Sequence, residues 1–202
     1  MSRLTEEILK SANGLAEGEV ILPKEFLHLG TRAAIDQALS RLARAGALMR
    51  ITRGAYVAPL AGRFGRRPPA VEQVVRSFAA KNGEVIAESG AAAANALGLT
   101  TQVPVREVFV TTGPSRRFRL GNRTVELRRA PGWQLALGKS AAGSAVRALE
   151  WLGPAHAREG LAALRHRLPP GEWRSLVAAR AALPAWMAQM IGEASVAGVS
   201  RG

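Results

Sequence analysis

The order of short segments between Val20 and Val57 constrains the fold of this chain more than any other feature. An apolar strand, a turn of helix opened by Pro23, a Gly-Thr corner, a second helix and a basic hairpin follow one another with almost no spare residues. This order is typical of a winged helix-turn-helix, which presents one helix to a DNA major groove and a basic loop to the flanking backbone. We therefore expect an α+β fold that begins with a winged helix-turn-helix domain over residues 1–60.

The predicted helix over residues 31–45 has an apolar face and an opposite face that is polar and basic. Thr31 can cap its start, and Gly46 ends it. Arg41 and Arg44 lie either on a DNA-contacting face or on a merely solvated one. The arginines of the next hairpin favour DNA contact, because a solvated helix does not require a second basic element beside it. The residues expected to contact DNA are Thr31, Arg32, Gln37, Ser40, Arg41, Arg44, Arg50 and Arg53.

A basic segment rich in proline and glycine, residues 61–69, follows the hairpin. Its composition is too polar and too interrupted for a packed element, so we predict a linker here. The rest of the chain, residues 70–202, is expected to form a mixed α/β C-terminal domain with a helical tail. Its expected elements are helices over 71–82 and 91–97, strands over 84–87, 105–111, 116–120 and 124–129, and helices beyond residue 131 that break near residues 153, 169 and 184.

The last two of these strands are joined by Gly121-Asn122, a dipeptide typical of a hairpin turn. Apolar and charged side chains alternate along both strands, so one face of the hairpin is expected in the core and the other is strongly basic. This basic face is a second candidate DNA-binding surface, and the alternative is a face that only keeps the protein soluble. The arginines concerned are Arg116, Arg117, Arg119, Arg123, Arg128 and Arg129.

The charge balance points to a polyanionic partner. The chain has 28 lysines and arginines against 15 acidic residues, which gives a net charge of +13. Such an excess favours binding to nucleic acid through its phosphates. An arginine-rich composition can also follow from a GC-rich genome, so the positions of the arginines carry more weight than their number.

The inventory of side chains argues against catalysis. Asp36 is the only aspartate of the chain, so a metal site built from paired aspartates is not available in its usual form. His28, His156 and His166 follow no metal-ligand spacing, and no Gly-rich phosphate loop of the Walker type occurs. The absence of cysteine excludes disulfides, thiolate-bound zinc and thiol catalysis. We expect no catalytic residue, no metal and no cofactor, and therefore no enzyme.

The sequence contains no uncharged run of membrane-spanning length. It also has no N-terminal apolar segment followed by a cleavage site. We therefore expect a cytoplasmic protein that has no membrane partner.

Three segments resemble the AbiEi-type antitoxins and their close relatives, which are two-domain regulators from bacterial abortive-infection operons. The most specific is AANALGLTTQVP, residues 93–104. The others are TGPSR, residues 112–116, and the hairpin stretch RITRGAY, residues 50–56. The resemblance covers most of the chain to about Pro154, and the helical tail is less diagnostic.

The resemblance implies an N-terminal winged helix that represses its own operon at inverted repeats in double-stranded DNA. It also implies a C-terminal domain that counters a nucleotidyltransferase-like toxin, in the type IV arrangement, without a stable complex between the two proteins. The basic hairpin over residues 116–129 would then serve DNA binding or antitoxicity. We expect a monomer in solution or a dimer on DNA.

Two other interpretations remain open. Shorter relatives also occur as solitary regulators, and a winged helix can serve assembly while a basic second domain binds RNA or a protein. Within residues 93–104, Asn95 and Gln102 have no obvious structural necessity. The interpretation that we favour is a buried amide that satisfies backbone groups, and the alternative is a ligand contact.

Overall fold

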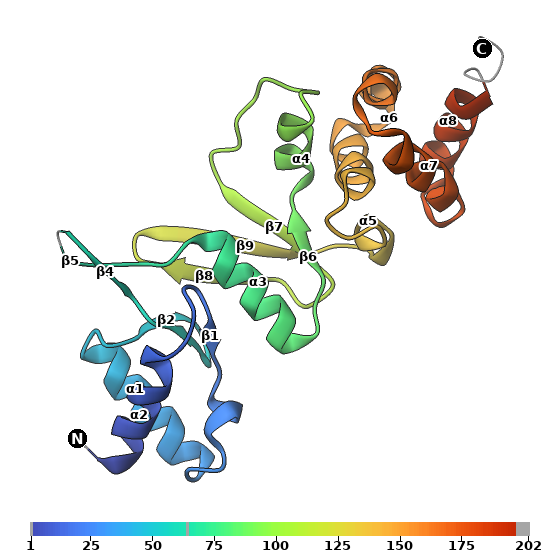
Figure 1. Ribbon diagram of the computed structural model, residues 1–202. Helices are drawn as coiled ribbons and strands as arrows, with labels where there is room; N and C mark the ends of the chain where they lie inside the picture. Colours follow the sequence, from blue (N-terminus) through green and yellow to red (C-terminus); the bar gives the residue numbers. More distant parts are fainter. Residues whose placement is uncertain (1, 64, 197–202) are drawn as a thin grey trace. The chain divides into compact units, whose positions relative to one another are not determined.

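The computed structural model describes residues 2–63 and 65–196, and it has the α+β class expected from the sequence (Figure 1). Contacts within the chain define two compact units, which are described separately below. The first unit comprises residues 1–84 and 116–126, and the second comprises residues 85–115 and 127–202. The first unit thus includes segments that the sequence pattern assigned to the C-terminal domain.

The first unit opens with helices and a three-stranded antiparallel sheet. Its elements are α1 (Arg3–Asn13), β1 (Val20–Ile21), the 3-10 helix η1 (Pro23–Phe26), α2 (Arg32–Arg44), β2 (Met49–Thr52) and β3 (Ala55–Val57). The strand order is β1-β3-β2, and Val20 lies opposite Val57 while Arg50 lies opposite Tyr56. These elements occur in the predicted order. Helix α1, which precedes them, ends at Asn13.

Buried side chains from α1, α2 and the sheet form one hydrophobic core. In α2 they recur at helical spacing, which leaves the opposite face of this helix to solvent. Tyr56 is 4 % exposed and packs in the core. The core residues are Ile8, Ala12, Ile21, Phe26, Ile35, Ala38, Leu39, Leu42, Leu48 and Tyr56.

The turns around α2 depend on one cap and two glycines. The Thr31 hydroxyl accepts a hydrogen bond from the backbone N–H of Ala34 at 3.3 Å, so the predicted cap is present. Gly46 and Gly54 have φ of +69° and +70°, in the left-handed region that glycine tolerates. Gly30, which precedes Thr31, is not among the glycines with positive φ in the described chain. The turn leads directly into the extended cap residue Thr31 and needs no reversal there.

The predicted linker is also wrong as a segment without structure. Residues 61–69 contain most of a two-stranded hairpin, β4 (Leu60–Gly62) and β5 (Gly65–Arg67), in which Ala61 lies opposite Arg66. Antiparallel pairing satisfies backbone groups whatever the side chains are, so a polar, glycine-rich segment can still pair. Arg66 also donates a hydrogen bond from Nη1 to the carbonyl oxygen of Gly46, which attaches the hairpin to the turn after α2.

Helix α3 (Val71–Asn82) has the bounds expected from the sequence and belongs to the first unit. The Ser77 hydroxyl accepts a hydrogen bond from the backbone N–H of Val20 at 2.8 Å. The Lys81 ammonium lies 2.6 Å from the Glu25 carboxylate. These contacts explain why α3 groups with the N-terminal residues and not with the residues that follow it.

A hairpin from later in the chain completes the first unit. Strand β8 (Arg116–Leu120) turns at Gly121, with φ of +62°, into β9 (Arg123–Arg129), as predicted. The Phe118 ring lies edge-on to the Phe78 ring of α3, with 4.8 Å between their centroids. Strand β8 also packs against β2. The first four residues of β9 belong to this unit, and its last three belong to the second.

The second unit combines a short strand pair with a set of helices. Its elements are β6 (Ile86–Glu88), α4 (Gly90–Ala96), β7 (Glu107–Thr111), α5 (Gly132–Leu135), α6 (Ala141–Arg167), α7 (Pro170–Ala179), η2 (Arg180–Ala182) and α8 (Ala185–Val196). Strand β6 is antiparallel to β7, with Ile86 opposite Thr111. The sheet that includes them has the strand order β6-β7-β9-β8.

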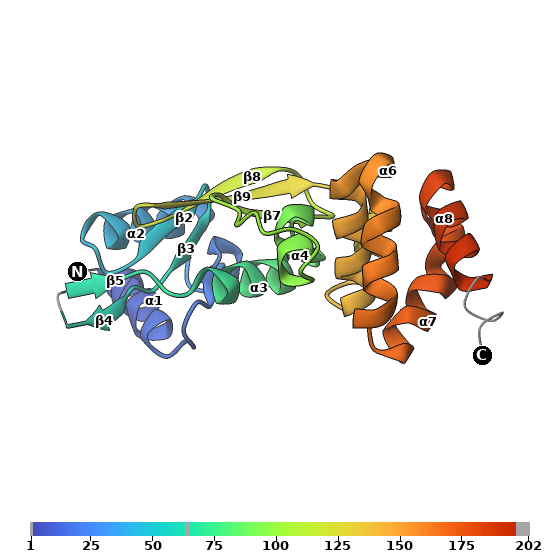
Figure 2. The ribbon, with the colours of Figure 1, turned by 90° about the horizontal axis from the view of Figure 1, so that it is seen from above.

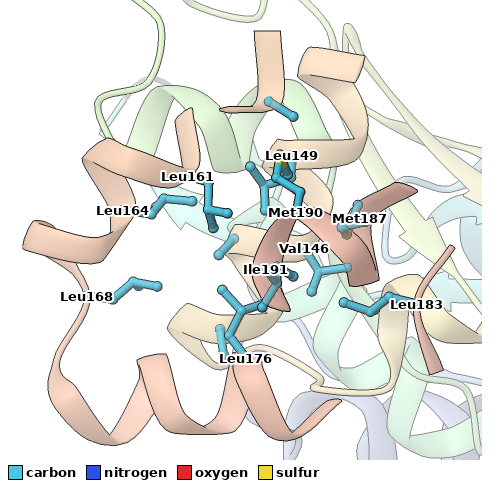
Figure 3. Close-up of a cluster of buried hydrophobic side chains, with 13 residues drawn as sticks. Val146, Leu149, Leu161, Leu164, Leu168, Leu176, Leu183, Met187, Met190 and Ile191 are labelled. Atoms are coloured by element: carbon cyan, nitrogen blue, oxygen red, sulfur yellow. The ribbon is translucent and has the colours of Figure 1, made fainter. Parts of the chain in front are cut away.

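Helix α6 is broken at Gly153, where φ is +71° and ψ is 168°. The break predicted at this Gly-Pro pair is confirmed. Figure 2 shows the two parts of α6 side by side, and a Cβ placed on Gly160 would lie 2.7 Å from Leu152 Cδ1. The two parts pack with α7 and α8 around a core that includes Leu149, Leu164 and Met187 (Figure 3).

Candidate nucleic-acid interface

The solvent face of α2 carries the residues that the sequence singles out for DNA contact. Arg32, Gln37, Arg41 and Arg44 are exposed, and Ser40 is half-buried. Because Ile35, Leu39 and the rest of the apolar stripe hold the other face in the core, these side chains are fixed on the solvent side of α2. The helix therefore presents a polar, arginine-rich face that begins at its capped N-terminus.

Arg32 links the start of α2 to the turn between β2 and β3. Its Nε donates to both carboxylate oxygens of Asp36, at 3.0 and 3.1 Å. Its Nη2 lies 4.0 Å from the position that a Cβ would take on Gly54. The only aspartate of the chain thus partly neutralises Arg32 and holds its guanidinium beside the hairpin turn.

The β2–β3 hairpin adds two exposed arginines to the same unit. Arg50 donates from Nε to the carbonyl oxygen of Thr52 at 3.4 Å, which orients the side chain along the strand. Arg53 is exposed at the turn, next to Gly54. All eight residues predicted for DNA contact, Thr31 included, therefore lie within the first unit, on α2 or on the hairpin that follows it.

A hollow of about 960 Å³ lies at the C-terminal end of α2. Four elements contribute an arginine each to its lining: α2, β2, β5 and β8. No carboxylate is among the lining residues. They are Ser40, Ala43, Arg44, Ala45, Gly46, Leu48, Met49, Arg50, Pro59, Arg66, Arg119 and Gly121.

Three of these lining residues, Ser40, Arg44 and Arg50, are among those predicted for DNA contact. Arg66 is not among the predicted residues, because the sequence predicts a linker in its segment. Arg119 was assigned to a separate surface, and the packing of β8 against β2 explains how it reaches the hollow. The sequence signal for Arg66 is the cluster of arginines at 63, 66 and 67 around two glycines, which also suits a basic hairpin.

The six arginines predicted to form a second basic surface are divided between the units. Arg117, Arg119 and Arg123 are exposed in the first unit, where Arg117 Nε lies 4.0 Å from Glu126 Oε1. Arg128 and Arg129 are exposed in the second unit. The sequence prediction treated all six as one surface.

Arg116 differs from the other five because its side chain is only 18 % exposed. Its guanidinium lies 4.8 Å from the centroid of the Phe78 ring, and its Nη2 lies 2.9 Å from Glu84 Oε1. Arg116 therefore connects β8 to α3 and stabilises the first unit through these partly buried contacts.

The second unit contains a buried arginine that is not among the residues predicted from the sequence. Arg147 of α6 is 1 % exposed and donates to the carbonyl oxygens of Gln134 and Gly138, at 3.2 and 2.9 Å. Its Nη2 lies 2.8 Å from Glu88 Oε1, and Ser144 also bonds this carboxylate. Burial raises the pKa of Glu88, but the bonds from Ser144 and Arg147 outweigh it and bring the pKa below the usual value.

Asn95 has the structural role that we favoured from the sequence. Its side-chain amide donates to the carbonyl oxygens of Gln102 and Thr100, at 3.0 and 3.4 Å. This amide holds the loop after α4 in place. For Gln102 the prediction of a buried amide is wrong, because its side chain is exposed; only its backbone N–H donates, to the Thr100 hydroxyl.

Residues 2–63 and 65–196 contain no group of three or more histidine, aspartate or glutamate side chains arranged to hold a metal ion. Within the same ranges, no helix has the length and apolar character needed to cross a membrane.

Comparisons with known proteins place the chain in a family and a fold. The profile of a family of unknown function, DUF6088, matches residues 5–163. The chain is similar to the crystal structure of RV2827C protein from Mycobacterium tuberculosis, with a TM-score of 0.51 and 16 % identity, over 95 % of this chain and 75 % of that one. At this identity the likeness concerns the fold alone. No curated protein matches the chain.

Proposed function

The chain belongs to the DUF6088 family, and we propose that it is a sequence-specific DNA-binding repressor whose first unit works as a winged helix-turn-helix. In this proposal η1 and α2 form the helix-turn-helix, and β2 and β3 form the wing. The observation that carries the proposal is the solvent face of α2, on which exposed arginines and Gln37 lie opposite a buried apolar stripe. Such a helix suits the major groove, where arginine and glutamine pair with base edges.

Each predicted contact has a role that suits its position. Arg32, Gln37, Ser40 and Arg41 would approach base edges from the solvent face of α2. Arg32 and Gln37 lie in the N-terminal half of this helix, which enters the groove most deeply, and Arg41 lies in its last turn. Arg50 and Arg53 would contact phosphates from the wing. Phosphate contacts fix the register of the protein on the duplex, and base contacts select the sequence.

We also propose that this repressor is the antitoxin of an AbiE-like type IV system and regulates its own operon at inverted repeats. The resemblance of residues 93–104, 112–116 and 50–56 to AbiEi-type antitoxins supports this role. The partner would be a nucleotidyltransferase-like toxin that forms no stable complex with the chain. Co-expression with such a toxin from a neighbouring gene tests this role: restored growth is expected, and continued growth arrest would overturn it.

Binding to DNA can be tested separately from antitoxicity. The full chain is titrated with three probes at equal salt: the duplex upstream of its own gene, a scrambled duplex and an RNA of the same sequence. A specific DNA-binding protein should prefer the first probe by about a thousandfold or more. Equal affinity for both duplexes would overturn the proposed repressor function. A preference for RNA would favour the alternative in which the winged helix serves assembly and a basic second domain binds RNA.

A further inference from the structure

We propose that the hollow at the C-terminal end of α2 is a binding site for the phosphodiester backbone of duplex DNA. This inference rests on the proposed DNA-binding function and adds a site to it. The site is built from four exposed arginines on four elements: Arg44 of α2, Arg50 of β2, Arg66 of β5 and Arg119 of β8. Only Arg44 and Arg50 belong to the helix and wing that a winged helix-turn-helix supplies by itself.

The charge of the lining selects an anion. Twelve residues line the hollow, and none of them is acidic. Like charges gathered without a carboxylate between them repel one another, and a phosphate placed among them removes that repulsion. Arginine is also suited to phosphate because its planar guanidinium offers five N–H donors in a fixed fork.

Hydrogen bonds orient three of the four arginines. Arg66 Nη1 donates to the carbonyl oxygen of Gly46. Arg44 Nη2 donates to the Ser40 hydroxyl at 3.3 Å, and Arg50 Nε donates to the carbonyl of Thr52 at 3.4 Å. Each bond uses one of the five N–H groups and restricts the side chain, so less rotamer entropy is lost when a phosphate binds.

The size and the walls of the hollow suit a strand of DNA better than a small ion. A volume of about 960 Å³ greatly exceeds the space that one phosphate group fills, so the site can accept a length of sugar-phosphate backbone. Gly46 and Gly121 line it without side chains that would hold a backbone away. The hollow also adjoins the end of α2, so a backbone seated there would border a groove occupied by this helix.

Arg119→Ala tests the site, and Arg117→Ala is its matched control. Both residues lie on the exposed face of β8, two positions apart, and each change removes one positive charge. Only Arg119 lines the hollow. Affinity of the full chain for its upstream duplex is measured against salt concentration, with thermal unfolding to confirm that both variants fold.

Loss of one phosphate contact should lower the slope of log affinity against log salt by about 0.9 in Arg119→Ala, and Arg117→Ala should leave it nearly unchanged. The Arg66→Gln, Arg119→Gln double variant should lower it by about 1.8, because two contacts are lost. Arg119→Ala and the double variant should still prefer the upstream duplex over the scrambled one, because base readout by α2 remains.

Equal slopes for Arg119→Ala and the unaltered chain would overturn the site while leaving the repressor in place. The same slope change in Arg117→Ala and Arg119→Ala would also overturn it, since the charge of the strand and not the hollow would then be responsible. Failure of the unaltered chain to prefer its upstream duplex is a different result, which refutes the proposed repressor and the site that depends on it.

Discussion

Arg147 and Glu88, fifty-nine residues apart in the sequence, form a pair in the second unit with 2.8 Å between Nη2 and Oε1. The Arg147 side chain is 1 % exposed and the Glu88 side chain is 31 % exposed. Arg147 also binds two backbone carbonyls near α5. A single buried cation therefore connects β6, α6 and the segment around α5, and its charge depends on Glu88 for compensation.

Removal of that compensation should destabilise the second unit. Glu88→Ala leaves the Arg147 guanidinium buried without its counter-charge, which costs about 3 kcal/mol or more. Urea unfolding followed by tryptophan fluorescence measures the change. Glu193→Ala is the control, because Glu193 pairs with Arg158 at 2.9 Å on the surface and should alter stability little. Equal losses of unfolding free energy in Glu88→Ala and Glu193→Ala would contradict the inference that the Arg147–Glu88 pair stabilises the second unit.

The same pair predicts how stability depends on pH. The pKa of Glu88 is lowered in the folded protein, so the unfolded chain binds a proton to this group more readily than the folded chain does. The contribution of the pair is therefore present above the ordinary glutamate pKa of 4.5 and is lost as the pH falls through the folded value. The difference in unfolding free energy between the natural chain and Glu88→Gln should shrink as the pH is lowered below 4.5. A constant difference from pH 7 to pH 3 would show that ionisation of Glu88 is not involved.

Two glycines in helices should respond in opposite ways to alanine. A Cβ on Gly90 of α4 would lie 2.5 Å from the Arg147 carbonyl oxygen and 2.7 Å from Trp151 Cβ, so α4 and α6 would have to separate. Gly90→Ala should cost about 1–3 kcal/mol, typical of overpacking. Gly171→Ala in α7 meets nothing within 4 Å and should stabilise the protein by up to about 1 kcal/mol. Thermal unfolding of both variants checks the pair, and a stabilised Gly90→Ala would refute the close packing of α4 on α6.

The sequence predicts best where local signals decide the structure. Helix α2 is preceded by the capping residue Thr31 and followed by Gly46. Helix α3 has apolar residues at helical spacing before Asn82-Gly83. The turn at Gly121 and the break at Gly153 likewise follow from residues that favour or require particular backbone angles. In each case the information lies within a few residues of the feature.

Features set by distant contacts could not be predicted in this way. The β4–β5 hairpin has three residues in each strand and no apolar alternation, and its Arg66 is attached to Gly46, twenty residues earlier. Strand β8 belongs to the first unit, where its Phe118 and Arg116 contact α3. Arg147 did leave a signal, because it interrupts the apolar residues Val146 and Leu149, but its partner could not be deduced from that.

The proposed base readout by α2 predicts a loss of specificity. Gln37→Ala or Arg41→Ala should reduce discrimination between the upstream duplex and random DNA by about 1–3 kcal/mol if the lost contact is bidentate. The measurement is the ratio of the two affinities at one salt concentration. Arg3→Ala is a control that removes a charge from α1, where Arg3 pairs with Glu7 at 3.0 Å. An equal loss on both DNAs would mean that Gln37 and Arg41 touch phosphate only.

Replacement of Asp36 should raise the affinity for random DNA and lower the specificity. Its carboxylate accepts two hydrogen bonds from Arg32, one of the residues proposed to contact DNA. Asp36→Asn removes a negative charge that repels DNA, so affinity for random duplex should rise. It also weakens the hold on Arg32, so the preference for the upstream duplex should fall. Titration of both duplexes with the full chain measures the two effects together. If affinity for random duplex falls, Asp36 supports the fold of α2 and does not restrain the charge of Arg32.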